Sequence, residues 1–120
     1  QMTVGSAGSL TAVGTFEDPI VFTGEGQVPG YWGGLRFYQS NSPNNRLEYV
    51  TIEYGGGYWN GNLYVTGSST MPAQATVINS HFAESGSWGI LITSYATVNS
   101  DLLTANTFAN NTNGDVSGLK

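Results

Sequence analysis

Apolar and polar residues alternate in several short segments of the chain, which is typical of β-strands with one buried face. In the segments 35–38 (Leu-Arg-Phe-Tyr) and 63–66 (Leu-Tyr-Val-Thr), the first and third residues are apolar and are expected to face inward. The second and fourth residues are expected to face outward, namely Arg36, Tyr38, Tyr64 and Thr66. No segment shows a helical period, so the pattern predicts an all-β chain.

Two columns of apolar residues recur at similar intervals. The first column consists of the leucines of a Gly-x-Leu motif, namely Leu10, Leu35, Leu63 and Leu91. Their spacings are 35 − 10 = 25, 63 − 35 = 28 and 91 − 63 = 28. The second has spacings of 30, 30 and 26 and consists of Phe22, Ile52, Phe82 and Phe108. A solenoid stacks equivalent residues about 4.8 Å apart, whereas antiparallel hairpins need no such repeat. The columns predict one domain over residues 1–120, a single-stranded parallel β-helix (a solenoid) of about four coils with roughly 28 residues per coil.

Segments rich in Gly, Asn and Pro separate the predicted strands. They include residues 25–30, 41–45, 55–57 and 110–114. Gly and Asn tolerate left-handed backbone conformations and Pro fixes φ, so these segments are expected to form the corners of each coil. For the same reason, we expect the side chains of several asparagines to bond backbone groups at the corners rather than sugars. These are Asn79, Asn99, Asn106, Asn110, Asn111 and Asn113.

Three segments of the chain resemble a known group of proteins. Residues 14–23 (GTFEDPIVFT), 32–37 (WGGLRF) and 47–56 (LEYVTIEYGG) look like the bacterial right-handed parallel β-helix repeat proteins, distant relatives of the pectate lyase fold. The resemblance implies a right-handed coil and a location outside the bacterial cell or on its surface. It does not assign a function, because this scaffold serves lyases, hydrolases, adhesins and passive stalks alike.

The charge of the chain restricts its partners. Charged residues make up 9% of the sequence, the formal net charge is −5, and the cations are Arg36, Arg46 and Lys120. Nucleic-acid binding needs a basic patch that so few cations do not form. No apolar run approaches the roughly 18 residues of a membrane span. There are no cysteines, so the sequence predicts no disulfide framework and no metal site built on thiolates. We also expect no cofactor and no other bound metal.

The acidic residues give little support for catalysis. Asp18 and Glu48 lie one repeat apart (48 − 18 = 30) and could be neighbours at a corner. Glu48 and Glu53 are expected on opposite faces of one strand, which does not pair them as hydrolases require. His81, the single histidine, is expected to face outward as an ordinary surface residue. The sequence therefore leans against an enzyme, although a fragment of a polysaccharide lyase or glycoside hydrolase stays an alternative.

Aromatic residues recur at one corner of the predicted coil. A tryptophan precedes the Gly-x-Leu strands with spacings of 59 − 32 = 27 and 88 − 59 = 29. Exposed aromatic rings can pack against the C–H faces of sugars, so a ladder of rings along the stack predicts a polysaccharide platform. Its candidate residues are Trp32, Trp59, Trp88, Tyr31, Tyr58, Tyr38, Tyr64 and Arg36. The alternatives are rings that fold over the coil edge as packing, and contact with another chain.

The two ends of the sequence read as parts of further strands. Residues 2–4 (Met-Thr-Val) and 116–119 (Val-Ser-Gly-Leu) continue the strand pattern, and neither end resembles a polar capping repeat. We therefore expect a segment of a longer extracellular β-helix, with coil ends that pair end to end or with another copy. The sequence favours a non-catalytic carbohydrate-binding or adhesive module; a structural, self-associating stalk is the remaining alternative.

Overall fold

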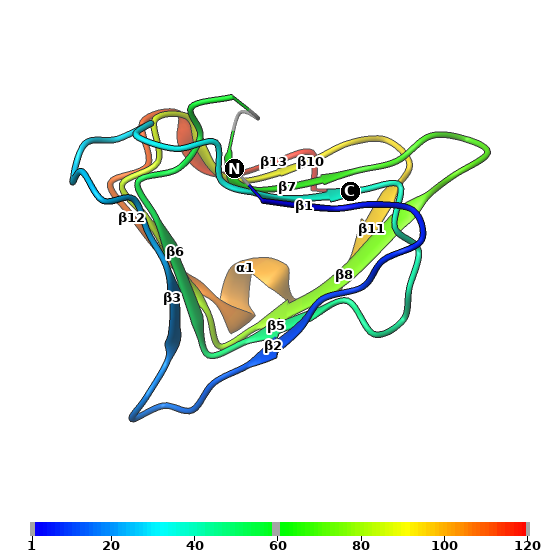
Figure 1. Cartoon of the computed structure of the whole chain (residues 1–120), viewed down its shortest axis with the longest axis horizontal. Coiled ribbons are helices and arrows are strands. Elements are labelled where there is room, and N and C mark those ends of the chain that lie inside the picture. Colours follow the sequence, from blue (N-terminus) through cyan, green and yellow to red (C-terminus); the bar gives the residue numbers. More distant parts are fainter. Residues whose placement is uncertain (1, 59–60, 120) are drawn as a thin grey trace.

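The computed structural model describes residues 2–58 and 61–119, which form three parallel sheets around one apolar core (Figure 1). Sheet A contains β1 (Met2–Val4), β4 (Leu35–Tyr38), β7 (Gly61–Thr66), β10 (Trp88–Ile92) and β13 (Gly114–Ser117), in that order. Sheet B contains β2 (Thr11–Val13), β5 (Arg46–Glu48), β8 (Ala73–Ile78) and β11 (Ala96–Val98). Sheet C contains β3 (Ile20–Phe22), β6 (Val50–Glu53), β9 (His81–Ala83) and β12 (Thr107–Ala109).

The chain visits sheets A, B and C in turn and then returns to sheet A one layer further along. All strand pairs are parallel, and equivalent residues are separated by 63 − 35 = 28 in sheet A and by 82 − 52 = 30 in sheet C. The predicted fold is confirmed as a parallel β-solenoid with about 28 residues per turn and about three turns. Sheets B and C each contain four strands, one for each of the four expected coils. Three turns of the chain connect these four layers.

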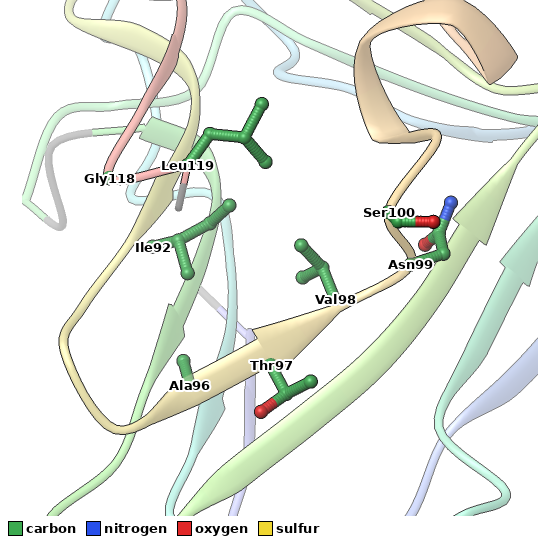
Figure 2. Close-up of a pocket in the computed structure, with 8 residues that line it drawn as sticks. All are labelled: Ile92, Ala96, Thr97, Val98, Asn99, Ser100, Gly118 and Leu119. Carbon is green, nitrogen blue, oxygen red and sulfur yellow. The ribbon is translucent and has the colours of Figure 1, made fainter.

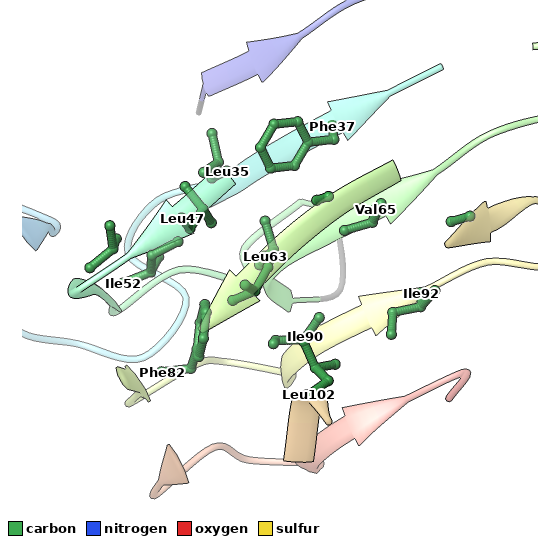
Figure 3. Close-up of a cluster of buried hydrophobic side chains, with 14 of the residues drawn as sticks. Leu35, Phe37, Leu47, Ile52, Leu63, Val65, Phe82, Ile90, Ile92 and Leu102 are labelled. Atoms are coloured by element: carbon green, nitrogen blue, oxygen red, sulfur yellow. The ribbon is translucent and has the colours of Figure 1, made fainter. Parts of the chain in front are cut away.

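The predicted second column is the spine of the core. Phe22, Ile52, Phe82 and Phe108 are paired one above another in sheet C. The rings of Phe82 and Phe108 stack with centroids 5.7 Å apart. Figure 3 shows Ile52 and Phe82 in one cluster with the side chains of sheet A, where Leu35, Phe37, Leu63 and Val65 are fully buried as predicted. Each such side chain contributes about 1.5–3 kcal/mol of apolar burial.

The predicted first column is wrong at both of its ends. Leu63 pairs with Ile90, not with Leu91, so Ile90 is fully buried and Leu91 is turned toward the outer face. Leu10 lies outside sheet A altogether, immediately before β2 in sheet B, and sheet A begins with β1 instead. The Gly-x-Leu motif predicted the wrong inward residue in this strand because Ile90 and Leu91 are adjacent and both apolar. A shift of one residue turns a whole strand over, and only the hydrogen-bond register selects between the two.

The corners of the coil use single left-handed residues and buried asparagine side chains. Tyr49 and Asn79 have φ values of 52° and 51° at the tight corner between sheets B and C. Asn45, Asn62, Asn99, Asn106 and Asn111 donate side-chain bonds to backbone carbonyls or accept them from backbone N–H groups. The predicted bonding of asparagine to the backbone is therefore confirmed for Asn99, Asn106 and Asn111, and Asn45 and Asn62, which the prediction did not include, bond the backbone in the same way. Buried backbone groups at a bend need such partners because the strand ladders do not reach them.

A short helix departs from the predicted all-strand pattern. α1 (Leu102–Ala105) stands between β11 and β12, and it lies inside the outline of the strands in Figure 1. It therefore covers the core at the end where the last strands lie. Leu102 is fully buried there while Leu103 is 49% exposed. A helix of four residues is too short to show a period in the sequence, which explains why the pattern missed it.

Candidate functional site

The outer face of sheet A collects the outward side chains of successive strands. Arg36 pairs with Tyr64, which in turn pairs with Leu91, and Tyr38 pairs with Thr66. Because side chains alternate along a strand, all of these point away from the core, as predicted for the residues of 35–38 and 63–66. We call this surface the sheet A platform, and we define it by Arg36, Tyr38, Tyr64, Thr66, Leu91 and Thr93.

The Arg36 guanidinium lies over the ring of Tyr38, with its central carbon 4.6 Å from the ring centroid. The two residues are two positions apart on β4, so they share the outer face. A guanidinium above a phenol ring gains about 0.5–1 kcal/mol at exposed sites. Tyr38 is nevertheless 41% exposed. The guanidinium therefore covers part of the Tyr38 ring and leaves the rest of the side chain open to solvent.

Threonine hydroxyls lie beside the pair formed by Arg36 and Tyr38. The Thr93 hydroxyl donates to the Thr66 hydroxyl at 3.2 Å, and Thr93 also accepts a bond from the Gly67 backbone N–H at 3.3 Å. Thr66 is directly opposite Tyr38 in the neighbouring strand. The sequence interpretation did not include Thr66, Leu91 or Thr93 among the site residues. The alternation in 63–66 already indicated Thr66, whereas Leu91 and Thr93 need the true register of β10.

Two of the predicted aromatic residues are exposed on the loops that lead from sheet C to sheet A. Tyr31 is 51% exposed and Tyr58 is 77% exposed. The ring of Tyr31 lies against the loop at Gly24 and Gly26, where an added Cβ would come within 2.7 Å and 2.4 Å of ring atoms. These glycines therefore allow the ring to lie flat on its own loop. Figure 1 places both loops at the same corner of the outline.

The tryptophans differ from one another in placement. Trp32 is half-buried against the core, and its indole N–H donates to the Glu53 carbonyl at 2.8 Å. Trp88 is also half-buried, and its ring covers Gly114, where an added Cβ would lie 2.8 Å from the ring. Trp59 lies outside the described residues. Trp32 and Trp88 thus have contacts that fit the packing alternative.

The register also separates Trp32 from Trp88. Trp88 pairs with Gly61. Gly61 stands two residues before Leu63, which pairs with Leu35, so its counterpart is Gly33 and not Trp32. Trp32 and Trp88 therefore occupy non-equivalent positions in the register of sheet A. Their rings do not form a single column along the stack.

The acidic residues are distributed differently from the sequence prediction. Glu48 is paired with Val13 and not with Asp18, which lies in a loop between β2 and β3. Its carboxylate accepts from Arg46, with the Nη2 atom at 2.9 Å. Glu53 belongs to sheet C, because the chain turns at Tyr49 rather than continuing one strand. Within residues 2–58 and 61–119, no three Asp, Glu, His or Cys side chains gather closely enough to hold a metal ion.

His81 lies where the repeat places it. It pairs with Thr51 on one side and Thr107 on the other, on the outer face of sheet C. Its Nδ1 atom is 2.7 Å from the Thr107 hydroxyl oxygen. The prediction of an outward histidine between two threonines is confirmed.

An apolar hollow of about 240 Å³ lies between β11 and the segment of Gly118 and Leu119 (Figure 2). Ile92, Ala96, Val98 and Leu119 supply its apolar wall, and Thr97, Asn99 and Ser100 lie along its rim. The hollow adjoins the edge of sheet B, because β11 is the outermost strand of that sheet. It offers an apolar surface and few polar groups.

Comparison of the chain with family models, with curated proteins and with solved structures finds no match. In the described residues, no helix combines the length and apolar character that crossing a membrane requires. The site must therefore be argued from its own geometry.

Proposed function

We propose that the chain is a non-catalytic carbohydrate-binding module of a secreted or surface-exposed bacterial β-helix protein, related to the right-handed parallel β-helix repeat proteins. The observation that carries the proposal is the Arg36 guanidinium 4.6 Å from the centroid of the Tyr38 ring, beside Tyr64 in the next strand. This arrangement holds flat aromatic groups and hydrogen-bond donors on one rigid sheet. A rigid site loses little conformational freedom when a ligand binds.

Sugars suit the sheet A platform because they combine apolar C–H faces with hydroxyl groups. The rings of Tyr38 and Tyr64 offer flat apolar surfaces, and each also carries a phenol hydroxyl. Arg36 supplies guanidinium donors, and Thr66 and Thr93 supply hydroxyls at the border. A ligand that spans several strands would meet aromatic, cationic and hydroxyl groups at intervals of about 4.8 Å along the stack.

The charge of the chain favours a neutral polysaccharide over an acidic one. The formal net charge is −5, and Arg36 is the cation on this platform. A polyanion approaching a negatively charged protein is repelled over roughly a Debye length, about 8 Å at physiological salt. One guanidinium stacked on a tyrosine contributes local polarity without reversing that field.

A glycan-array screen of the full chain tests the proposal. We expect binding to neutral polysaccharides, with affinity reduced about 10-fold or more by Tyr38→Ala and by Tyr64→Ala, because buried aromatic anchors dominate such contacts. Val28→Ala is the matched control, since Val28 is 61% exposed on a loop outside the platform. Binding that Tyr38→Ala and Tyr64→Ala leave unchanged, or no binding to any glycan, contradicts the proposal.

A second candidate function is self-association into a stalk. The outermost strands β1, β2 and β3 at one end, and β13, β11 and β12 at the other, each have a sheet neighbour on one side only. The molecule measures 37 × 29 Å across the stack, which gives an end face on the order of 500–800 Å². Stable interfaces bury about 800 Å² per partner, so an end-to-end contact with a second copy is of adequate size.

Sedimentation velocity separates this candidate from the first. A stalk would show concentration-dependent oligomers, and Val13→Lys on the outermost strand β2, where Val13 is 51% exposed, would reduce them by adding a charge to the edge. A monomer at every accessible concentration would exclude self-association while leaving the carbohydrate proposal intact.

A further inference from the structure

A recessed groove runs along the corner between sheets B and C, away from the sheet A platform. It is shallow and open to solvent, with a volume of about 330 Å³, and its lining includes Phe16, Tyr49, Asn79, His81, Thr104 and Thr107. These residues come from all successive layers of the stack, from the loop after β2 to the start of β12. The groove therefore follows the long direction of the corner and not a single strand.

The groove exists because the connections between sheets B and C are short in the middle layers and long in the outer layers. Only Tyr49 separates β5 from β6, and only Asn79 and Ser80 separate β8 from β9. In contrast, residues 14–19 separate β2 from β3, and residues 99–106, with α1, separate β11 from β12. Figure 1 shows the first of these loops as a projection at the corner between β2 and β3. The two longer connections thus flank a floor made by the short ones.

Phe16 forms the wall of the groove on the side of the first layer. Its side chain is 82% exposed, which places a large apolar ring in water without the benefit of burial. The loop around it is nevertheless held in place. Thr15 and Asp18 exchange two backbone bonds of 3.2 Å, and the loop ends bond to the neighbouring layer through Gly14 N–H to the Glu48 carbonyl at 2.8 Å. These bonds hold the loop, so the exposed ring has a defined position beside the groove.

The floor and the far side of the groove carry polar side chains. His81 Nδ1 and the Thr107 hydroxyl oxygen are 2.7 Å apart, so the imidazole has a defined orientation. Asn79 has an exposed side chain on a backbone held by a 2.7 Å bond from its N–H to the Ala105 carbonyl. Thr104 adds a further exposed hydroxyl. Among the described residues, no Asp, Glu, Lys or Arg lines the groove.

We propose that this corner groove is a second ligand site that takes a neutral mono- or disaccharide. The Phe16 ring would pack against the C–H face of one sugar ring, and His81, Asn79 and Thr104 would bond its hydroxyl groups. A volume of about 330 Å³ is at the lower end of the 300–1,000 Å³ that small-molecule sites occupy, which favours a short sugar over a long polymer. Because no described lining residue is Asp, Glu, Lys or Arg, the groove favours a neutral ligand over a sugar acid or a sugar phosphate.

The test uses the ¹⁵N-labelled full chain with cellobiose, maltose and lactose, each added to about 20 mM so that a millimolar affinity is visible. We expect at least one of the three sugars to shift the amide signals of Asn79, His81 and Thr107 together with the imidazole signals of His81. Phe16→Ala should weaken that response about 10-fold, because it removes the stacking ring. The exposure of Phe16 keeps the variant folded, and unchanged signals from sheet A verify this.

Two control variants separate this site from the sheet A platform. Val28→Ala removes an exposed apolar side chain elsewhere, and Tyr38→Ala disables the platform; neither should change the response at His81. Sugar-induced shifts confined to sheet A and lost in Tyr38→Ala would overturn the corner groove and leave the proposed function standing. Shifts at His81 that persist in Phe16→Ala, or no shift there with any of the three sugars, would also overturn it.

Discussion

The neighbouring residues Ile90 and Leu91 provide a direct test of the register of sheet A. The structure buries Ile90 completely and turns Leu91 toward the outer face, half-buried. Ile90→Ala removes three buried carbon groups at about 0.8 kcal/mol each, or roughly 2.4 kcal/mol. The cavity that remains raises the expected cost to about 3–4 kcal/mol, within the range for such core substitutions. Leu91→Ala leaves no enclosed cavity, so we expect a loss of about 1 kcal/mol or less.

Urea unfolding followed by tryptophan fluorescence and far-UV circular dichroism measures both variants. With a slope of about 1–3 kcal/mol per molar urea, Ile90→Ala should lower the midpoint by more than about 1 M, and Leu91→Ala by a few tenths of that or less. Both substitutions shorten an apolar side chain to the same final residue, so they control for each other. If Leu91→Ala proves the more destabilising of the two, the strand is turned over and the register described above is wrong.

Two further pairs of substitutions test the corner and the helix. The buried Asn62 amide makes three hydrogen bonds of 2.7–3.0 Å to backbone groups; we expect Asn62→Ala to cost about 3 kcal/mol or more because those groups lose their partner while shielded from water. Asn44→Ala, at an exposed corner, should cost under about 0.5 kcal/mol, and equal losses of thermal stability in the two variants would contradict the corner role. In α1, Leu102→Ala should cost about 2–5 kcal/mol and Leu103→Ala little, since only the first is buried. Similar unfolding midpoints for these two would show that α1 does not cover the core.

The outward residues of the candidate site could be assigned before the fold was known. Alternation alone placed Arg36, Tyr38 and Tyr64 on the surface, because a strand with one buried face must turn every second side chain away from the core. Their grouping into one platform depends on the pairing of β4 with β7, and the repeat spacing of 28 residues already indicated that pairing. The stacking of Arg36 on Tyr38 did not follow from either pattern.

The placement of the tryptophans and of Phe16 could not be read from local sequence. A ring beside glycine can fold over the core or project into water, and the choice depends on which backbone lies next to it. Trp32 finds the Glu53 carbonyl as a partner for its indole N–H. Phe16 lies on a loop whose counterpart in the next layer is the single residue Tyr49, so no equivalent loop packs over it.

The sequence by itself determined the period, the column of Phe22, Ile52, Phe82 and Phe108, and the use of asparagine at corners. These features repeat because each coil rests on the previous one, so stacked positions require similar side chains. The tertiary structure alone decided whether Ile90 or Leu91 faces the core, where α1 covers the end of the stack, and which residues line the corner groove. Those choices depend on hydrogen bonds and insertions between layers many residues apart, which a pattern of apolar positions along the chain does not encode.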